Sequence, residues 1–312
     1  MRSLELRQVD VRDFQSANHF LFVSGVCEAF STHGFLQVVG HGITRERMEQ
    51  ADRITEELFS LPRDVLMRYA RPGIMFQRGY AGYGAETAKD SEVPDLKDFF
   101  QVRCQELPAD PRNNPFGENI FPTEVPQFRE MSLFLLGESL RVGRAVLSAL
   151  EEGFDLSPGS LVGRTVGAET IQRTIHYRPL SAFSDAAQLG AWRAAPHRDI
   201  NLATAMPCAN AKGLVLKLGD VWFETETVRD SMIVDTGEML RLVPGLESLQ
   251  PTTHAVMNPE GADLEKSRSS YPVFIHGILY GNMIRSAPES DELVDYAVPF
   301  LRRIKEITRK GV

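Results

Sequence analysis

The second half of the chain contains a series of short apolar segments, each of strand length, separated by turn residues. They follow one another between residues 170 and 280. This texture is typical of a sandwich, a jelly roll or a barrel, because short strands at close spacing must pair to bury their apolar faces. The segments are TIQRTIHY, NLATAMP, GLVLKL, VWFET, SMIVD, THAVMN and SYPVFIHGILY.

The first 160 residues have a helical bias instead. Apolar residues at helical spacing predict helices over residues 21–32, 44–60 and 126–153, and the apolar run GFLQVVGHGI predicts a short strand within residues 34–43. Residues 72–125 are rich in Gly, Pro and Asn, which predicts an irregular stretch that covers a site or lies on the surface.

No internal repeat or linker marks a domain boundary, so we expect a single domain over residues 1–312. Within it, residues 1–160 form a helical and mixed region that packs on a β core at residues 165–282. Charged and apolar residues alternate at helical spacing near the end of the chain, which predicts a C-terminal helix over residues 289–310. The expected fold class is α+β, mainly β.

Composition excludes several classes of protein. The chain has 34 basic and 42 acidic side chains, a net charge of −8, which argues against a nucleic-acid partner. Cys27, Cys104 and Cys208 are far apart, so neither a disulfide scaffold nor a cysteine zinc site is expected. No apolar run approaches the length of a membrane span. We therefore expect no membrane partner and a reducing, cytoplasmic location.

The candidate metal ligands are His197 and Asp199, two residues apart, and the distant His254. In an extended segment, residues two apart leave the same face and can converge on one point. Two imidazoles and one carboxylate form the facial triad, which leaves positions on a ferrous ion open. Taken alone this pattern is weak, because an isolated histidine is more often structural than ligating.

A second candidate site follows in the segment SRSSYPVF. Arg268 and Ser270 are also two residues apart, and Pro272 and Phe274 continue the same register. A guanidinium beside a hydroxyl suits a carboxylate, because the planar fork contacts both oxygens and the hydroxyl adds a donor. The alternative for Arg268 is an ordinary surface arginine at a strand end.

With these residues the sequence resembles the isopenicillin N synthase-like family of non-haem iron, 2-oxoglutarate-dependent oxygenases. The similar segments occur in family order and cover nearly the whole chain. In the first half they are GFLQVVGHGI (34–43), LPRDVLMRY (61–69), RGYAGYG (78–84) and DLKDFFQV (95–102). In the second half they are HRDINLATAMP (197–207), GLVLKLGDVWFET (213–225), SMIVDTGEMLRL (231–242), TTHAVMNP (252–259) and RSSYPVF (268–274).

The resemblance implies a double-stranded β-helix, a jelly roll whose open mouth holds the iron and whose outer face is packed by N-terminal helices. It implies that His197, Asp199 and His254 bind Fe(II), with no catalytic residue beyond these ligands. All three of these ligands are present in this sequence, which argues against a halogenase.

The resemblance further implies that Arg268 and Ser270 bind the distal carboxylate of 2-oxoglutarate, and that Tyr177 lies near this cosubstrate. Ile175 stands where relatives often have asparagine, and Ser269 stands where an aromatic residue is common. These departures change the expected shape of the pocket more than its ligands.

The implied reaction is oxidation of a C–H bond of a small molecule with O2, with release of succinate and CO2. Hydroxylation is the default outcome, and desaturation or cyclisation are alternatives. We expect a role in secondary metabolism and a monomer or homodimer. Two other functions stay open: a 2-oxoglutarate-independent oxidase like isopenicillin N synthase, and a non-catalytic metal- or ligand-binding sensor.

Candidate substrate residues come from three places in the sequence. If Arg178 faces the cavity, an anionic substrate is favoured; ordinary packing is the alternative for each candidate. We interpret the histidines His33, His41, His176 and His276 as structural or outward-facing. The predicted substrate residues are Arg78, Tyr80 and Phe100 from the irregular stretch, Arg178 beside Tyr177, and Trp192 before the metal-binding segment.

Overall fold

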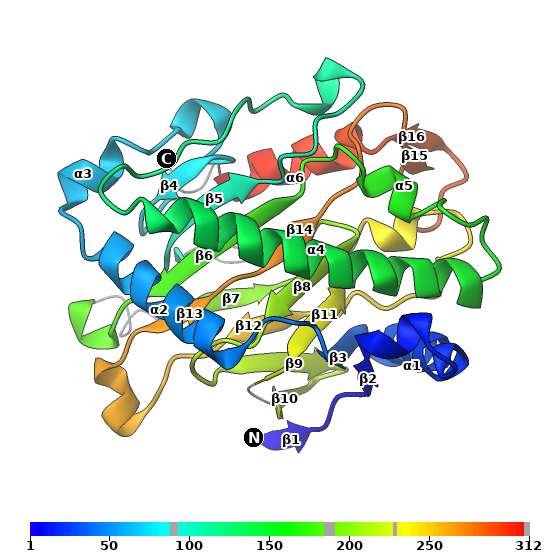
Figure 1. Cartoon of the computed structure of the whole chain (residues 1–312), viewed down its shortest axis with the longest axis horizontal. Coiled ribbons are helices and arrows are strands. Elements are labelled where there is room, and N and C mark those ends of the chain that lie inside the picture. The colour runs from blue at the N-terminus through cyan, green and yellow to red at the C-terminus, as the bar shows by residue number, and fades with distance from the viewer. Residues whose placement is uncertain (88–92, 184–190, 227–229, 309–312) are drawn as a thin grey trace.

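Two β-sheets form the centre of the molecule, and strands of the second half of the chain alternate between them (Figure 1). A computed structural model describes residues 1–87, 93–183, 191–226 and 230–308. Proceeding from β6 to β14, the chain crosses repeatedly from the larger sheet to the smaller and back. This crossing is the topology of a jelly roll, so the predicted fold is confirmed.

The larger sheet has the order β2-β3-β11-β8-β14-β6-β5-β4, and β13 also pairs with β6. Most of its strands are buried on both faces, because the smaller sheet lies on one side and helices lie on the other. Its strands are β2 (Gln8–Asp10), β3 (Phe35–Val39), β4 (Gly79–Ala81), β5 (Asp98–Arg103), β6 (Ile171–Tyr177), β8 (Ala203–Pro207), β11 (Met232–Thr236), β13 (Arg268–Ser270) and β14 (Val273–Ile275).

The smaller sheet has the order β1-β10-β9-β12-β7, and a separate hairpin pairs β15 with β16. Its central strands face the larger sheet and leave a space between the two layers, in which the site described below lies. The strands are β1 (Arg2–Leu4), β7 (Ala194–His197), β9 (Leu214–Leu218), β10 (Val221–Thr225) and β12 (His254–Val256), and the hairpin consists of β15 (Met283–Arg285) and β16 (Leu293–Asp295).

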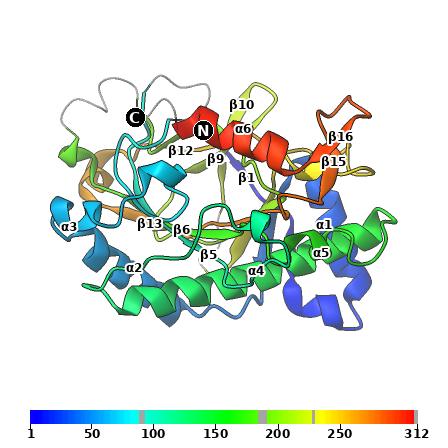
Figure 2. The same cartoon turned by 90° about the horizontal axis from the view of Figure 1, so that it is seen from above.

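The long helix α4 crosses the outer face of the larger sheet, and α6 lies on the opposite side of that sheet (Figure 2). Helix and sheet approach closely at Gly143, where an added Cβ would lie 2.0 Å from Cδ1 of Ile275. The helices predicted from periodicity are confirmed as α1, α2 and α4. The helices are α1 (His19–Thr32), α2 (Arg45–Phe59), α3 (Arg63–Met67), α4 (Gln127–Gly153), α5 (Val162–Thr165) and α6 (Ala297–Thr308).

Two segments differ from the sequence-based expectation. The stretch 72–125 contains β4 and β5, and β5 pairs with β6 over its whole length. All six residues of β5 are buried, so the strand lacks the alternation by which a half-exposed strand is recognised. The C-terminal helix begins only at Ala297, because Leu293–Asp295 pair with Met283–Arg285 as a hairpin.

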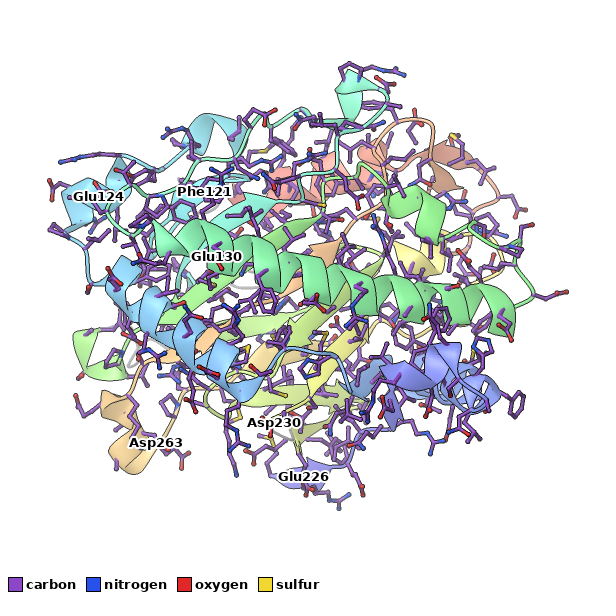
Figure 3. The ribbon with its side chains drawn as sticks, viewed as in Figure 1. Phe121, Glu124, Glu130, Glu226, Asp230 and Asp263 are labelled. Carbon is purple, nitrogen blue, oxygen red and sulfur yellow. The ribbon has the colours of Figure 1, made fainter. Side chains whose placement is uncertain are left out.

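Exposed acidic side chains occur at several places on the surface of the described residues. Those labelled in Figure 3 lie in three parts of the chain, near residues 124–130, 226–230 and 263. All three cysteines are free. Among the described residues, no helix has the length and apolar character needed to cross a membrane. The labelled acidic residues are Glu124, Glu130, Glu226, Asp230 and Asp263.

Candidate functional site

The three predicted metal ligands meet at one point between the two sheets. Strands β7 and β12 pair so that His254 lies opposite His197, with ring centroids 4.4 Å apart. Asp199 lies just beyond the end of β7, and its Oδ1 is 3.6 Å from Nε2 of His197 and 3.8 Å from Nε2 of His254. One ligand atom from each residue lies within 4.8 Å of the other two. The structure therefore brings together the three residues that the sequence predicts as metal ligands.

Hydrogen bonds orient each ligand toward this point. Nδ1 of His197 is 2.8 Å from the carbonyl of Ala195, so it carries the ring proton and leaves Nε2 free as an acceptor. Nδ1 of His254 is likewise 3.2 Å from the carbonyl of Thr252. Burial and the neighbouring His197 lower the pKa of His254 to about 4, which keeps its ring neutral and able to bind a metal. This donor set fits Fe(II).

Asp199 is held from the other side by the hydroxyl of Thr204, which donates to Oδ2. That contact leaves Oδ1 to face the two imidazoles. Asn201 in turn donates to the Thr204 hydroxyl over 2.8 Å. The backbone N–H of Glu238 donates to the carbonyl of Asp199 over 2.7 Å, which fixes the loop that follows β7. The carboxylate thus has one oriented oxygen available for a metal.

A small cavity of about 80 Å³, here called the inner cavity, lies between the sheets on one side of the triad. Alternate residues of the segment 268–274 line it, as the spacing of two predicts, and Tyr177 lies across from Arg268 in the β13–β6 register. The inner cavity is lined by Phe35, Lys97, Arg173, Ile175, Tyr177, Ala194, His197, Asp199, Thr204, Met206, Leu214, Ile233, Asp235, His254, Val256, Arg268, Ser270, Pro272 and Phe274.

Arg268 has an unsatisfied donor in this cavity. Its side chain is almost fully buried, its Nε donates to the carbonyl of Ala211 over 3.2 Å, and its guanidinium lies 5.1 Å from the ring centre of Tyr177. Among the described residues, no group accepts a hydrogen bond from its second nitrogen, Nη1. A buried cationic donor without a partner is costly, so this arrangement fits an anion that completes the site.

A larger cavity of about 450 Å³, here called the outer cavity, adjoins the inner cavity at His197 and Asp199. His197 and Asp199 line both cavities, so the metal site is at their junction. Its volume is in the range of small-molecule sites. The outer cavity is lined by Gln77, Glu86, Thr87, Asp95, Lys97, Ile171, Arg173, Pro196, His197, Arg198, Asp199, Ile200, Asn201, Glu238, Thr253, Phe274, His276, Arg303, Ile304 and Ile307.

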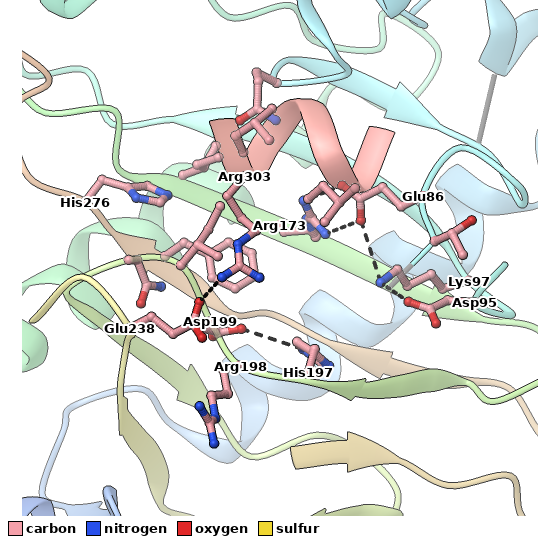
Figure 4. A pocket seen from close by; sticks show the side chains of 18 of the residues that line it. Glu86, Asp95, Lys97, Arg173, His197, Arg198, Asp199, Glu238, His276 and Arg303 are labelled. Carbon is pink, nitrogen blue, oxygen red and sulfur yellow. Dashed lines mark hydrogen bonds and ion pairs between the residues drawn. The ribbon is translucent and has the colours of Figure 1, made fainter. Parts of the chain in front are cut away.

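Four charged side chains form a closed cluster on one wall of the outer cavity (Figure 4). Arg173 donates two hydrogen bonds to Glu86, of 2.9 and 3.0 Å. Lys97 lies 2.7 Å from Asp95 and 3.7 Å from Glu86. Burial alone would raise the pKa of Glu86, but Arg173 and Lys97 hold it below its usual value. The cluster therefore pairs two acidic with two basic side chains, whose formal charges cancel.

A further ion pair links α6 to the loop after β11. Arg303 of α6 reaches across the outer cavity to Glu238, with a nitrogen–oxygen distance of 2.6 Å (Figure 4). Since the N–H of Glu238 also contacts the backbone of Asp199, this pair connects α6 to the metal-binding loop. The charges of Arg303 and Glu238 neutralise each other.

The structure places Arg78 away from both cavities, contrary to the predicted substrate contact. Its guanidinium is buried and lies 2.7 Å from Glu169, which also accepts from Arg103 over 3.0 Å. Sequence gives the residue type at position 78 but not the acid, 91 positions away, that neutralises it. Arg78 is part of a buried ion-pair cluster rather than a substrate site.

The other four predicted substrate residues also lie outside the residues that line either cavity. The hydroxyl of Tyr80 donates to Asp98 over 2.8 Å, and Nε of Arg178 lies 2.6 Å from the same carboxylate. Phe100 is fully buried in the main hydrophobic core. Trp192 packs against Trp222, with ring centroids 6.0 Å apart. Tertiary packing, which residue type does not reveal, decides each of these positions.

Replacing Glu169 with glutamine should destabilise the fold by about 3–5 kcal/mol, because it leaves Arg78 and Arg103 buried without a counter-charge. Chemical denaturation of the purified variant measures this loss. Glu106→Gln is the matched control: its partner Arg144 is 2.6 Å away, but Glu106 is 37% exposed and the pair is worth at most about 1 kcal/mol. An equal loss in both variants would contradict the buried cluster.

The sequence does not predict several of the residues that line the outer cavity. His276, interpreted above as structural or outward-facing, lines this cavity. Arg173 occurs inside an ordinary strand segment, and Lys97, although part of the DLKDFFQV motif, carries no signal of a binding role. Arg303 comes from the C-terminal helix. No local pattern links these segments, because only the tertiary fold brings them to one cavity.

Comparison with known proteins agrees with this geometry. Residues 8–124 match the family model described as the N-terminal part of a non-haem dioxygenase in morphine synthesis. The chain is 26% identical to a 2-oxoglutarate-dependent dioxygenase of Aspergillus niger over 259 residues, which covers 82% of this chain and 78% of the relative. It is 25% identical to a 2-oxoglutarate-dependent dioxygenase of Penicillium crustosum, covering 92% and 89%.

Solved structures have the same fold. A protein of Caulobacter crescentus described as a member of the 2OG-Fe(II) oxygenase family aligns with a TM-score of 0.82 and 24% identity, over 96% of this chain and 98% of that one. A full-length protein of Neurospora crassa, solved in complex with alpha-KG, aligns with a TM-score of 0.81 and 17% identity, over 96% and 95%. At these sequence identities the comparison shows that the fold is shared.

Proposed function

Because the chain belongs to the non-haem Fe(II), 2-oxoglutarate-dependent oxygenases, we propose that it oxidises an unactivated C–H bond of a small molecule with O2 and converts 2-oxoglutarate to succinate and CO2. One observation carries this proposal. The candidate triad and the unpartnered Nη1 of Arg268 line the same inner cavity, so a metal ligand set and an anion site lie within reach of one small molecule.

In this proposal His197, Asp199 and His254 hold Fe(II) through Nε2, Oδ1 and Nε2. The backbone carbonyls of Ala195 and Thr252 keep the ring protons on Nδ1, so both Nε2 atoms stay available. The iron, with its keto acid, supplies the activation of O2 that removes hydrogen from an unactivated carbon. The protein contributes the orientation of the ligands and of the bound molecules.

Arg268 and Ser270 bind the distal carboxylate of 2-oxoglutarate in this proposal. Nη1 of Arg268 donates to one carboxylate oxygen, and the Ser270 hydroxyl, on the same face of β13, supplies a further donor. The ring of Tyr177 closes the cavity beside the guanidinium. The cosubstrate then spans from this end of the inner cavity to the metal.

The outer cavity takes the substrate. It shares His197 and Asp199 with the inner cavity, so a molecule within it lies beside the residues that would hold the metal. The position of the target hydrogen relative to the metal decides between hydroxylation, desaturation and cyclisation. Hydroxylation is the outcome we propose.

Anaerobic titration of the purified protein with Fe(II) and then 2-oxoglutarate tests this function. We expect the weak visible charge-transfer band of a keto acid bound to iron, and one succinate formed for each 2-oxoglutarate consumed once O2 is admitted. Removing iron with a chelator should abolish both signals. If iron binds and no band forms, the 2-oxoglutarate-independent oxidase is the better function, and Arg268 serves a carboxylate of the substrate itself.

A further inference from the structure

His276 lines the outer cavity on the side across from the charged cluster. His276 follows β14, is 3% exposed, and packs edge-on against Phe300 of α6 with ring centroids 4.8 Å apart. Figure 4 shows its ring across the cavity from Glu86 and Lys97. The apolar side chains among the residues that line the outer cavity are Ile171, Ile200, Phe274, Ile304 and Ile307.

The hydrogen bonds of His276 determine which ring nitrogen carries its proton. Nδ1 is 3.2 Å from the hydroxyl of Tyr296. Tyr296 is fully buried, and among the described residues Nδ1 of His276 is the partner of its hydroxyl, so this buried O–H donates its proton to Nδ1. Burial lowers the pKa of His276 to about 3, and the ring is neutral. A neutral ring that accepts at Nδ1 carries its proton on Nε2.

The Nε2–H of His276 is an unused donor. Among the described residues none is hydrogen-bonded to Nε2, and His276 is one of the residues that line the cavity. The ring cannot turn its Nδ1 edge into the cavity without breaking the contact with Tyr296. A hydrogen-bond donor of fixed direction therefore points into a space of about 450 Å³.

Apart from Arg198 and the metal ligand Asp199, the charged side chains that line this space are already paired. Arg173 and Lys97 are neutralised by Glu86 and Asp95, and Arg303 is neutralised by Glu238. Arg198 also lines the cavity, but its side chain is exposed and donates to the hydroxyl of Thr253. A charged group of a substrate would lose its hydration here and gain no buried, unpaired charge among the described residues. The cavity therefore favours a molecule without net charge.

We propose that the outer cavity binds an uncharged small molecule, and that His276 is a specificity-determining residue whose Nε2–H donates to an acceptor atom of that molecule. The inference rests on the proposed function in taking the outer cavity as the substrate site. It replaces the expectation of an anionic substrate, which depended on Arg178 facing the cavity, because Arg178 is paired with Asp98 instead.

Nitrogen NMR of protein labelled with 15N-histidine, loaded with Zn(II) and 2-oxoglutarate, tests the proton position. The resonance that disappears in His276→Phe identifies the residue. We expect a neutral ring with its proton on Nε2 throughout pH 5–8, and a mixture of the two neutral forms in Tyr296→Phe. A proton on Nδ1, or a charged ring at pH 7, would overturn the proposal.

Ligand binding to the same zinc-loaded protein tests the substrate class. The probes are benzamide and benzoate, nicotinamide and nicotinate, and hexanamide and hexanoate, followed by saturation-transfer NMR. We expect each carboxamide that binds to do so about tenfold more tightly than its carboxylate. His276→Phe, which keeps the packing against Phe300, should weaken the carboxamide about three- to tenfold, and His276→Gln, which retains an N–H of similar reach, should restore it.

Equal or tighter binding of the carboxylates, an unchanged carboxamide affinity in His276→Phe, or no binding by any member of the three pairs would each overturn the proposal. Binding of 2-oxoglutarate is read from its own resonances in the same samples. If carboxamides bind through His276 while 2-oxoglutarate does not bind, the proposed function fails and the role of His276 stands. If 2-oxoglutarate binds and the carboxamides do not, the role of His276 fails and the proposed function stands.

Discussion

A variant in which Asp199 is replaced by asparagine should lose more than about a hundredfold in iron affinity and lose succinate formation with it. The substitution keeps the size of the side chain but removes the charge that faces Nε2 of His197 and His254. Changes in the partners of metal ligands commonly cost about 10- to 100-fold in metal affinity, so the loss of a ligand itself should exceed that range. Anaerobic iron titration and succinate release measure the two effects.

Two further variants make this result specific. Thr204→Val removes only the hydroxyl that donates to Asp199, and we expect an intermediate loss of about 10- to 100-fold in iron affinity. Asp230→Asn makes the same chemical change at the surface (Figure 3), where Asp230 is exposed and paired with Arg45 at 2.6 Å. This control should behave as the unchanged protein. Full iron binding by Asp199→Asn would remove Asp199 from the ligand set.

The convergence of His197, Asp199 and His254 could be predicted because its geometry is mostly local. His197 ends β7 and Asp199 follows it by two residues, so the backbone limits how far apart their side chains can lie. The distant His254 reaches them through one strand pairing, that of β12 with β7. The same holds for Arg268 and Ser270, since alternation along a strand decides which side chains share a face. Short-range rules of this kind are readable from spacing alone.

The walls of the outer cavity could not be predicted in this way. Arg78 and Arg173 are both arginines next to or within strand segments, yet one is buried against Glu169 and the other lines the cavity. The difference depends on which acid the fold brings beside each guanidinium. His276 likewise lines the cavity because Phe300 of α6 and Tyr296, which directly precedes that helix, contact its ring. These contacts join segments with no fixed spacing, so the sequence carries no signal for them.

Replacing Arg268 with glutamine should weaken the binding of 2-oxoglutarate by a factor of about a hundred or more while leaving iron binding unchanged. The buried guanidinium has a free donor in the inner cavity, and removing one partner of a buried charge pair costs about 3–5 kcal/mol. Arg268→Lys keeps the charge but loses the planar fork, so we expect an intermediate loss. The 2-oxoglutarate concentration that gives half of the visible band measures each affinity.

Arg178→Gln provides the matched control for this comparison. Arg178 directly follows Tyr177 but is directed to Asp98 instead of the inner cavity, so its replacement should leave 2-oxoglutarate affinity unchanged. If Arg268→Gln binds 2-oxoglutarate as tightly as the unchanged protein, Arg268 does not bind this cosubstrate. The triad would still bind iron, and the anion held by Arg268 would be another molecule. The measurement therefore distinguishes a cosubstrate site from a substrate carboxylate site at the same arginine.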